Sequence, residues 1–262
     1  MVRIAVNGIE CIQQTWDDAF NWDGVADEIY LTWSVSVVTA GAGVPNVGQS
    51  GVYGDINNQP GRIQAGSATN KGGIKTGDVI PTMRMGKPPL PPGLPPGIPI
   101  PLFPQPAWSS IPKDGFPMTI WDGDIGPNTI VSVVPLVNEF DGGIVDPGPA
   151  IKVGNKVAMA VAGAVAVAVP VVGLVAAIVG PIVEGIANSI GTAGNRPIGR
   201  RLNDNDNITE AAWQVVSLNS QSAGAAATQD NGYGPGVYRL VQTDPADIGA
   251  GAYALYVQVS VV

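Results

Sequence analysis

Residues 28–38 read EIYLTWSVSVV, and this stretch decides the fold class. Successive side chains of a β-strand point to opposite faces, so a period of two predicts a strand with one buried face. The last residues of the chain, AGAYALYVQVSVV at 250–262, repeat the pattern. In the first stretch the bulky apolar residues stand at every second position, as Ile29, Leu31, Trp33, Val35 and Val37.

Strand-like stretches both precede and follow two unusual segments. The chain has 262 residues with 35 Gly and 24 Pro, and charged residues make up only 13%, which favours an all-β protein with many turns or a subunit of an assembly. We therefore predict a single antiparallel β-sandwich formed by residues 1–150 and 192–262. A proline-rich loop at 81–117 and an apolar insertion at 151–191 interrupt it.

Two local features add to this prediction. Residues 1–15 are expected to form one or two short strands around a turn at Asn7-Gly8. The stretch rich in Ser, Gly and Ala at 219–236 is expected to be a loop.

The proline-rich loop is centred on residues 88–106, PPLPPGLPPGIPIPLFPQP, where ten of nineteen positions are proline. Such a sequence is typical of an extended polyproline II segment. It serves either as a rigid connection or arm over a neighbouring surface, or as a docking peptide for a proline-reading module.

Composition excludes several classes of function. The net charge of −8 provides no basic stripe for nucleic acid and argues against simple electrostatic adhesion to anionic lipid. There is no histidine, so histidine-based catalysis and the usual zinc sites are excluded. The single cysteine, Cys11, is expected in the core. The acidic pairs Asp17/Asp18 and Asp122/Asp124 are commoner as turn residues than as acid–base pairs, and we do not expect an enzyme. No signal peptide is recognised, and the localisation stays open.

Acidic residues cluster in two places. The first is DDAFNWDGVADEIYL at 17–31, and the second is NEFDGGIVD at 138–146, which contains Glu139. Calcium prefers six to eight oxygen ligands from acidic loops, so these stretches could supply the two halves of one site. The alternative is that the acids are turn formers at loop tips. The predicted calcium ligands are Asp17, Asp23, Asp27 and Asp141.

Three short motifs resemble the C-two domain family, the calcium-dependent phospholipid-binding β-sandwiches. DGVADEIYL, with Asp23, Gly24, Asp27 and Tyr30, is similar to the first calcium loop of that family. NEFDGG is similar to the opening of its third loop, and NRPIG at 195–199 to the strand that closes it. The resemblance implies a sandwich whose loops beside a calcium site touch lipid, and it makes the apolar insertion an enlarged third loop.

The apolar insertion contains VAMAVAGAVAVAVPVVGLVAAIVGPIV at 157–183, without one charged, amide or hydroxyl side chain. As one helix it would be about 40 Å long, enough to cross a bilayer core. Pro170 would break or kink such a helix. The segment is expected to be a helical hairpin turning near Pro170, a single kinked transmembrane helix, or a core element buried between copies of the chain.

We therefore expect a membrane-associated protein that presents an apolar hairpin to a bilayer, with a pore-forming homo-oligomer and calcium dependence as further expectations. The alternative is a self-assembling structural subunit of a capsid, sheath or filament. Aromatic residues beside the first acidic stretch, Trp16, Phe20 and Trp22, would anchor at the membrane interface or pack on the end of the sandwich. The residues expected to contact membrane or neighbouring copies are Val161, Val165, Val169, Val171, Leu174, Ile178 and Ile182.

Overall fold

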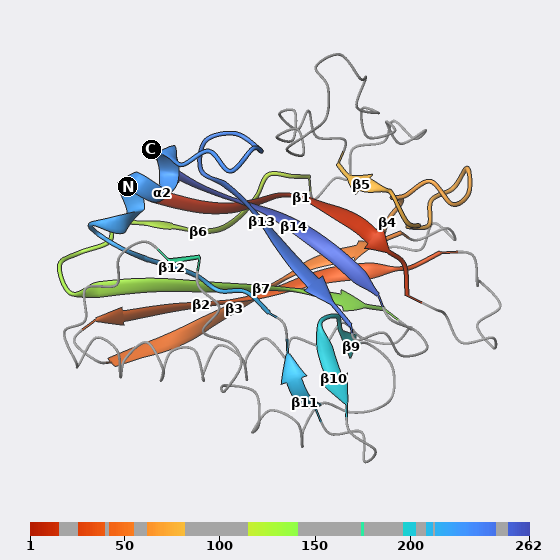
Figure 1. Ribbon diagram of the computed structural model, residues 1–262, viewed down its shortest axis with the longest axis horizontal. Coiled ribbons are helices and arrows are strands. Elements are labelled where there is room, and N and C mark those ends of the chain that lie inside the picture. The colour runs from red at the N-terminus through yellow and green to blue at the C-terminus, as the bar shows by residue number, and fades with distance from the viewer. Residues whose placement is uncertain are drawn as a thin grey trace, which may run out of the picture.

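The chain was analysed as a computed structural model that describes residues 1–15, 26–39, 42–54, 62–81, 115–140, 174–175, 196–202, 208–211, 213–244 and 251–262. Most of these residues lie in strands, and the strands form two large sheets and one small one (Figure 1). The predicted all-β class is confirmed.

The first large sheet has five strands, and its centre is the antiparallel pair formed by the first and last strands of the chain. β13 pairs with one edge of β14, while β5 and β6 pair one after the other with the free edge of β1. The strands are β1 (Val2–Gln13), β5 (Val79–Ile80), β6 (Met118–Gly123), β13 (Val237–Thr243) and β14 (Ala252–Val261).

The second large sheet has seven strands in the order β4-β3-β2-β7-β12-β8, with β9 paired to β7. All pairs are antiparallel except β3 with β4. The strands are β2 (Ile29–Thr39), β3 (Ala42–Tyr53), β4 (Arg62–Ile63), β7 (Thr129–Glu139), β8 (Leu174–Val175), β9 (Arg196–Pro197) and β12 (Val216–Asn219).

A small sheet and a short helix complete the described structure. β10 (Arg200–Leu202) and β11 (Ile208–Ala211) pair with each other, and α2 (Ser222–Thr228) packs against β14 and β12. The helix lies within the stretch 219–236 that was expected to be a loop. Its sequence, SAGAAAT, is rich in alanine, the strongest helix former, so local propensity explains the difference.

The two large sheets bury one continuous apolar core. β1 and β14 of the first sheet contribute side chains such as Ile4 and Leu255, and β2 and β7 of the second contribute Leu31 and Val133. Cys11 lies in this core as a free, buried thiol, as expected. Figure 1 shows the β1–β14 side of the molecule lying over the β2–β7 side.

Two local predictions need correction. The stretch EIYLTWSVSVV forms β2, but its second face is buried as well: Tyr30, Thr32, Ser34 and Ser36 are at most 1% exposed, and Tyr30 packs with Val52 and Phe140. The residues Asn7-Gly8 form no hairpin turn. β1 continues through them with an irregularity between Val6 and Gly8, because β14 pairs with the strand on both sides of that point.

Candidate functional site

The described chain stops and resumes at one end of the two sheets, which we call the junction end, on either side of residues 16–25, 141–195 and 245–250. Within these three stretches the structure describes only Leu174 and Val175. Glu139 at the end of β7 pairs with Ile29 of β2 and with Arg196 of β9. Gln13 of β1 pairs with Ala252 of β14. The chain therefore enters and leaves the acidic stretch and the apolar insertion at neighbouring points (Figure 1).

Asp27, one of the predicted calcium ligands, is buried at the junction end. Its backbone forms an isolated bridge with Ile74, with N···O distances of 2.8 and 3.1 Å, and the residue is only 1% exposed. Both carboxylate oxygens accept hydrogen bonds. The Thr15 amide donates to one at 2.8 Å, the Thr15 hydroxyl donates to the other at 2.9 Å, and the Tyr253 hydroxyl also donates to Asp27.

Thr15 links Asp27 to a second buried carboxyl. The Thr15 hydroxyl oxygen lies 2.5 Å from Glu139 Oε1 and 2.9 Å from Asp27 Oδ1. A hydroxyl carries a single proton and can donate only once. Both contacts are hydrogen bonds when the Asp27 carboxyl is protonated and donates to the Thr15 oxygen, while the Thr15 hydroxyl donates to Glu139.

The pKa of Asp27 agrees with this proton count. Burial raises the pKa of this carboxyl from 3.8 to about 7, and the charge of Glu139 adds to the rise. Hydrogen bonds from Tyr253 and Thr15 lower the pKa but do not offset the loss of solvation. Near neutral pH, Asp27 thus exists as a mixture of the acid and the carboxylate.

Two further titratable groups lie beside Asp27. Burial raises the pKa of the Cys11 thiol, so the thiol stays protonated and is a poor nucleophile or metal ligand. Burial also raises the pKa of the Tyr253 phenol well above its ordinary value, and the neighbouring charge of Asp27 acts in the same direction. Tyr253 therefore remains a neutral donor to Asp27.

Asp244 joins the other two segments of the junction end. Its carboxylate accepts the Gly199 N–H at 2.8 Å and the Gly251 N–H at 3.4 Å. Gly199 ends the NRPIG motif, and its φ of +92° is a conformation that favours glycine. One carboxylate thus fixes the backbone beyond residues 141–195 and beyond residues 245–250.

The structure describes few of the predicted site residues. Asp27 is described in full, whereas Asp17, Asp23 and Asp141, together with Trp16, Phe20 and Trp22, lie outside the described residues. Of the predicted contact residues, only the backbone of Leu174 is described. It lies in β8, where Leu174 and Val175 pair with β12 in an extended conformation and not in a helix. The other predicted contact residues also lie outside the described part of the chain. They are Val161, Val165, Val169, Val171, Ile178 and Ile182.

The sequence indicated some partners of Asp27 but not others. The two acidic stretches were expected to meet, and Asp27 and Glu139 do lie on either side of Thr15. Tyr253 was recognisable as a buried member of the last strand, but no sequence signal pairs it with a residue 226 positions away. Nothing in the sequence marked Thr15.

The described part of the chain lacks both a metal-binding cluster and a helix that could span a membrane. It contains no group of three or more Asp, Glu, His or Cys side chains placed to hold a metal ion. None of the helices in the same residues combines the length and the apolar character that a membrane span requires.

Comparison of this chain with protein-family models, with curated proteins and with solved structures finds no match. The function is therefore argued from the chain's own residues.

Proposed function

We propose that this chain is a non-enzymatic, membrane-engaging protein. In this proposal the two sheets form a C-two-like β-sandwich, and the acidic and apolar segments act together at its junction end. The observation that supports it is the register at Glu139, which pairs with Ile29 at the base of the first acidic stretch and with Arg196 at the base of the apolar insertion. In C-two-like domains the loops that bind calcium and touch lipid also share one end.

The apolar insertion would supply the binding free energy. Burial of apolar surface contributes about 25 cal/mol per Å², so a few Leu, Ile and Val side chains in the acyl region suffice for reversible association. The net charge of −8 opposes approach to an anionic surface, so we expect contact with lipid to be driven by the apolar insertion.

Asp27 does not fit the role of a direct calcium ligand in the described geometry. Both of its oxygens accept hydrogen bonds, and its pKa of about 7 favours proton binding. Asp27 holds the base of the acidic stretch in place, and the prediction of a calcium site rests on Asp17, Asp23 and Asp141.

The test is co-sedimentation of the full chain with liposomes of phosphatidylcholine, with and without phosphatidylserine, in calcium and in chelator. A variant that lacks residues 157–183 should lose binding. A variant that lacks the proline-rich residues 88–106 is the control for a deletion and should keep it. Full chain that stays in the supernatant under every condition would contradict membrane engagement. A difference between calcium and chelator would support the calcium site.

A second candidate is a self-assembling structural subunit, and β8 favours it. Leu174 and Val175 of the apolar insertion pair through their backbones with Val216 and Ser217 of β12, so at this point the insertion pairs with a protein strand. If the full chain forms large regular particles without lipid, and removal of residues 157–183 reduces them to monomers, the insertion is an assembly contact. Sedimentation velocity in detergent-free buffer gives this answer.

A further inference from the structure

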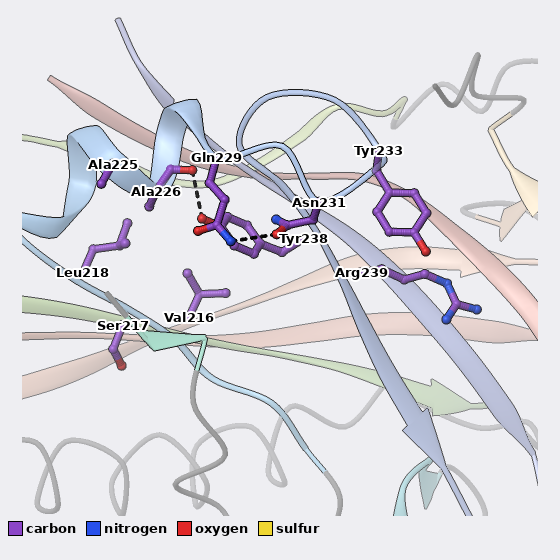
Figure 2. A pocket seen from close by; sticks show the side chains of 10 residues that line it. All are labelled: Val216, Ser217, Leu218, Ala225, Ala226, Gln229, Asn231, Tyr233, Tyr238 and Arg239. Atoms are coloured by element: carbon purple, nitrogen blue, oxygen red, sulfur yellow. Dashed lines mark hydrogen bonds between the residues drawn. The ribbon is translucent and has the colours of Figure 1, made fainter. Parts of the chain in front are cut away.

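A cavity of about 470 Å³ lies between α2, β12 and β13 (Figure 2). This volume is within the range of small-ligand sites. The cavity is not part of the junction end. α2 lies beside the two termini of the chain, which meet where β1 begins and β14 ends (Figure 1).

The inner wall of the cavity is apolar. Val216 and Leu218 of β12 and Tyr238 of β13 are all buried and line it. The Tyr238 hydroxyl donates to the Ala226 carbonyl at 2.9 Å, so its polar group already has a partner (Figure 2). This wall suits an aliphatic side chain.

The outer wall contains a strand edge. Among the described strands β13 pairs with β14 alone, so it is an edge strand of its sheet. The Val241 N–H donates to the Gln214 side chain at 2.9 Å, so Val241 faces away from β14. In an antiparallel ladder this orientation recurs at every second residue, and the β13–β14 register is unbroken. The N–H and C=O of Arg239 therefore also point to the free edge.

Arg239 is the open position of that edge. Within the described residues, neither its backbone N–H nor its C=O has a hydrogen-bond partner. The positions on both sides are occupied. The Val237 N–H donates to the Gly234 carbonyl at 3.2 Å, and Asn231 donates to the Val237 carbonyl at 3.1 Å. With Gln214 on Val241, the edge is open for one residue only.

The charge beside the cavity is neutralised within the protein. The Arg239 guanidinium donates to Glu10 Oε2 from two nitrogens, at 3.1 and 3.0 Å. The Tyr256 hydroxyl donates to the same oxygen at 2.5 Å. The cavity therefore presents no unpaired charge from Arg239 and favours an uncharged ligand.

We propose that this cavity binds a short uncharged peptide in an extended conformation. One ligand residue would pair its own N–H and C=O with those of Arg239, as in strand addition. The side chain of the next ligand residue points to the opposite face of the sheet, the face of Tyr238, so this residue would place an apolar side chain against Val216, Leu218 and Tyr238. Gln214 and Asn231 exclude a longer added strand, because each already satisfies the next backbone group along the edge. This inference is independent of membrane engagement.

The test uses the ¹⁵N-labelled full chain and the peptide acetyl-Gly-Leu-Gly-amide as the probe. We expect a saturable shift of the Arg239 backbone amide resonance, with a dissociation constant in the millimolar range or below. In this peptide the first glycine would pair with Arg239 and the leucine would enter the cavity, so the same peptide with an N-methylated first glycine lacks the donor for the Arg239 carbonyl. It should bind about tenfold more weakly, the usual effect of one lost hydrogen bond.

Two matched variants locate the site. Ala225 is an exposed residue of α2 that lines the cavity, so Ala225→Phe should fill it and weaken binding at least about tenfold. Thr228 is an exposed residue of the same helix outside the lining, and Thr228→Phe should leave binding unchanged. An unshifted Arg239 resonance at saturating probe, equal binding of the N-methylated peptide, or unchanged binding by Ala225→Phe would each overturn the proposal.

Discussion

At the scale of the residue, burial of the Asp27 carboxyl lowers the stability of the fold near neutral pH. Its carboxyl accepts hydrogen bonds from Thr15 and Tyr253, yet its pKa is raised to about 7 by burial. The folded chain thus holds the proton more tightly than the unfolded chain does. Between the unfolded and folded pKa values the native state carries more protons, so the free energy of unfolding falls as the pH rises through this window.

The first prediction concerns Asp27→Asn. The shift from 3.8 to about 7 corresponds to about 4 kcal/mol that the wild type loses between pH 4 and 7 and the variant does not. Asparagine fits the site, because its amide can donate to the Thr15 oxygen while its carbonyl accepts from the Thr15 amide. Urea unfolding at a series of pH values should show a difference between variant and wild type that grows toward pH 7 and then levels off.

The control for this measurement is Asp124→Asn. Its side chain is 89% exposed, and the substitution should change the free energy of unfolding by less than about 0.5 kcal/mol at any pH. A wild-type-minus-variant difference at Asp27 that stays constant from pH 4 to 7 would contradict the raised pKa.

At the scale of the element, a tryptophan of β2 packs over a glycine of β3. Trp33 pairs with Gly48 across the two strands. A Cβ atom built on Gly48 would lie 2.3 Å from the Trp33 ring, so the indole covers the glycine. This contact helps to fix the register of two strands whose sequences alone permit other alignments.

The second prediction is that Gly48→Ala displaces the Trp33 ring and destabilises the fold by about 1–3 kcal/mol. The urea midpoint should fall with an unchanged slope, and tryptophan fluorescence should shift in the native baseline. Gly224→Ala on α2 is the matched control, because no heavy atom lies within 4 Å of its added Cβ. It should stabilise the chain by about 0.5–1 kcal/mol. Equal effects of the two substitutions would exclude the packing explanation.

The elements also show how far sequence reasoning reaches. The strands β2 and β14 were predicted because alternation is a local pattern that needs no knowledge of neighbours. The continuation of β1 through Asn7-Gly8 was missed, because the pairing of β14 on both sides of it depends on residues near the far end of the chain. The two acidic stretches could be predicted to lie near each other because both are rich in carboxylates. The hydrogen bonds of Thr15 and Tyr253 to Asp27 depend on tertiary structure and could not be predicted from the sequence.

At the scale of the molecule, the residues on either side of the apolar insertion are neighbours in one sheet. Glu139 and Arg196 are paired neighbours, although 57 positions separate them. A loop closed at its base by a strand pair can be shortened at little cost, since loop-closure free energy varies slowly with length.

The third prediction is that replacing residues 151–191 with a short Gly/Ser linker leaves a folded chain. The expected loss is less than about 2 kcal/mol, because the described part of the insertion contributes only the two cross-strand pairs of β8. Thermal unfolding and near-ultraviolet circular dichroism measure the outcome. A variant without a cooperative transition would show that the insertion is part of the core.

The pairing of the first and last strands has a practical consequence for orientation. The Val262 amide donates to the Met1 carbonyl at 3.0 Å, and the β1–β14 ladder runs from there to Gln13 and Ala252 at the junction end. A chain immobilised on a sensor surface through either terminus would therefore direct the junction end toward the bulk solution. The two tethering geometries are equivalent, so binding signals recorded with each should agree.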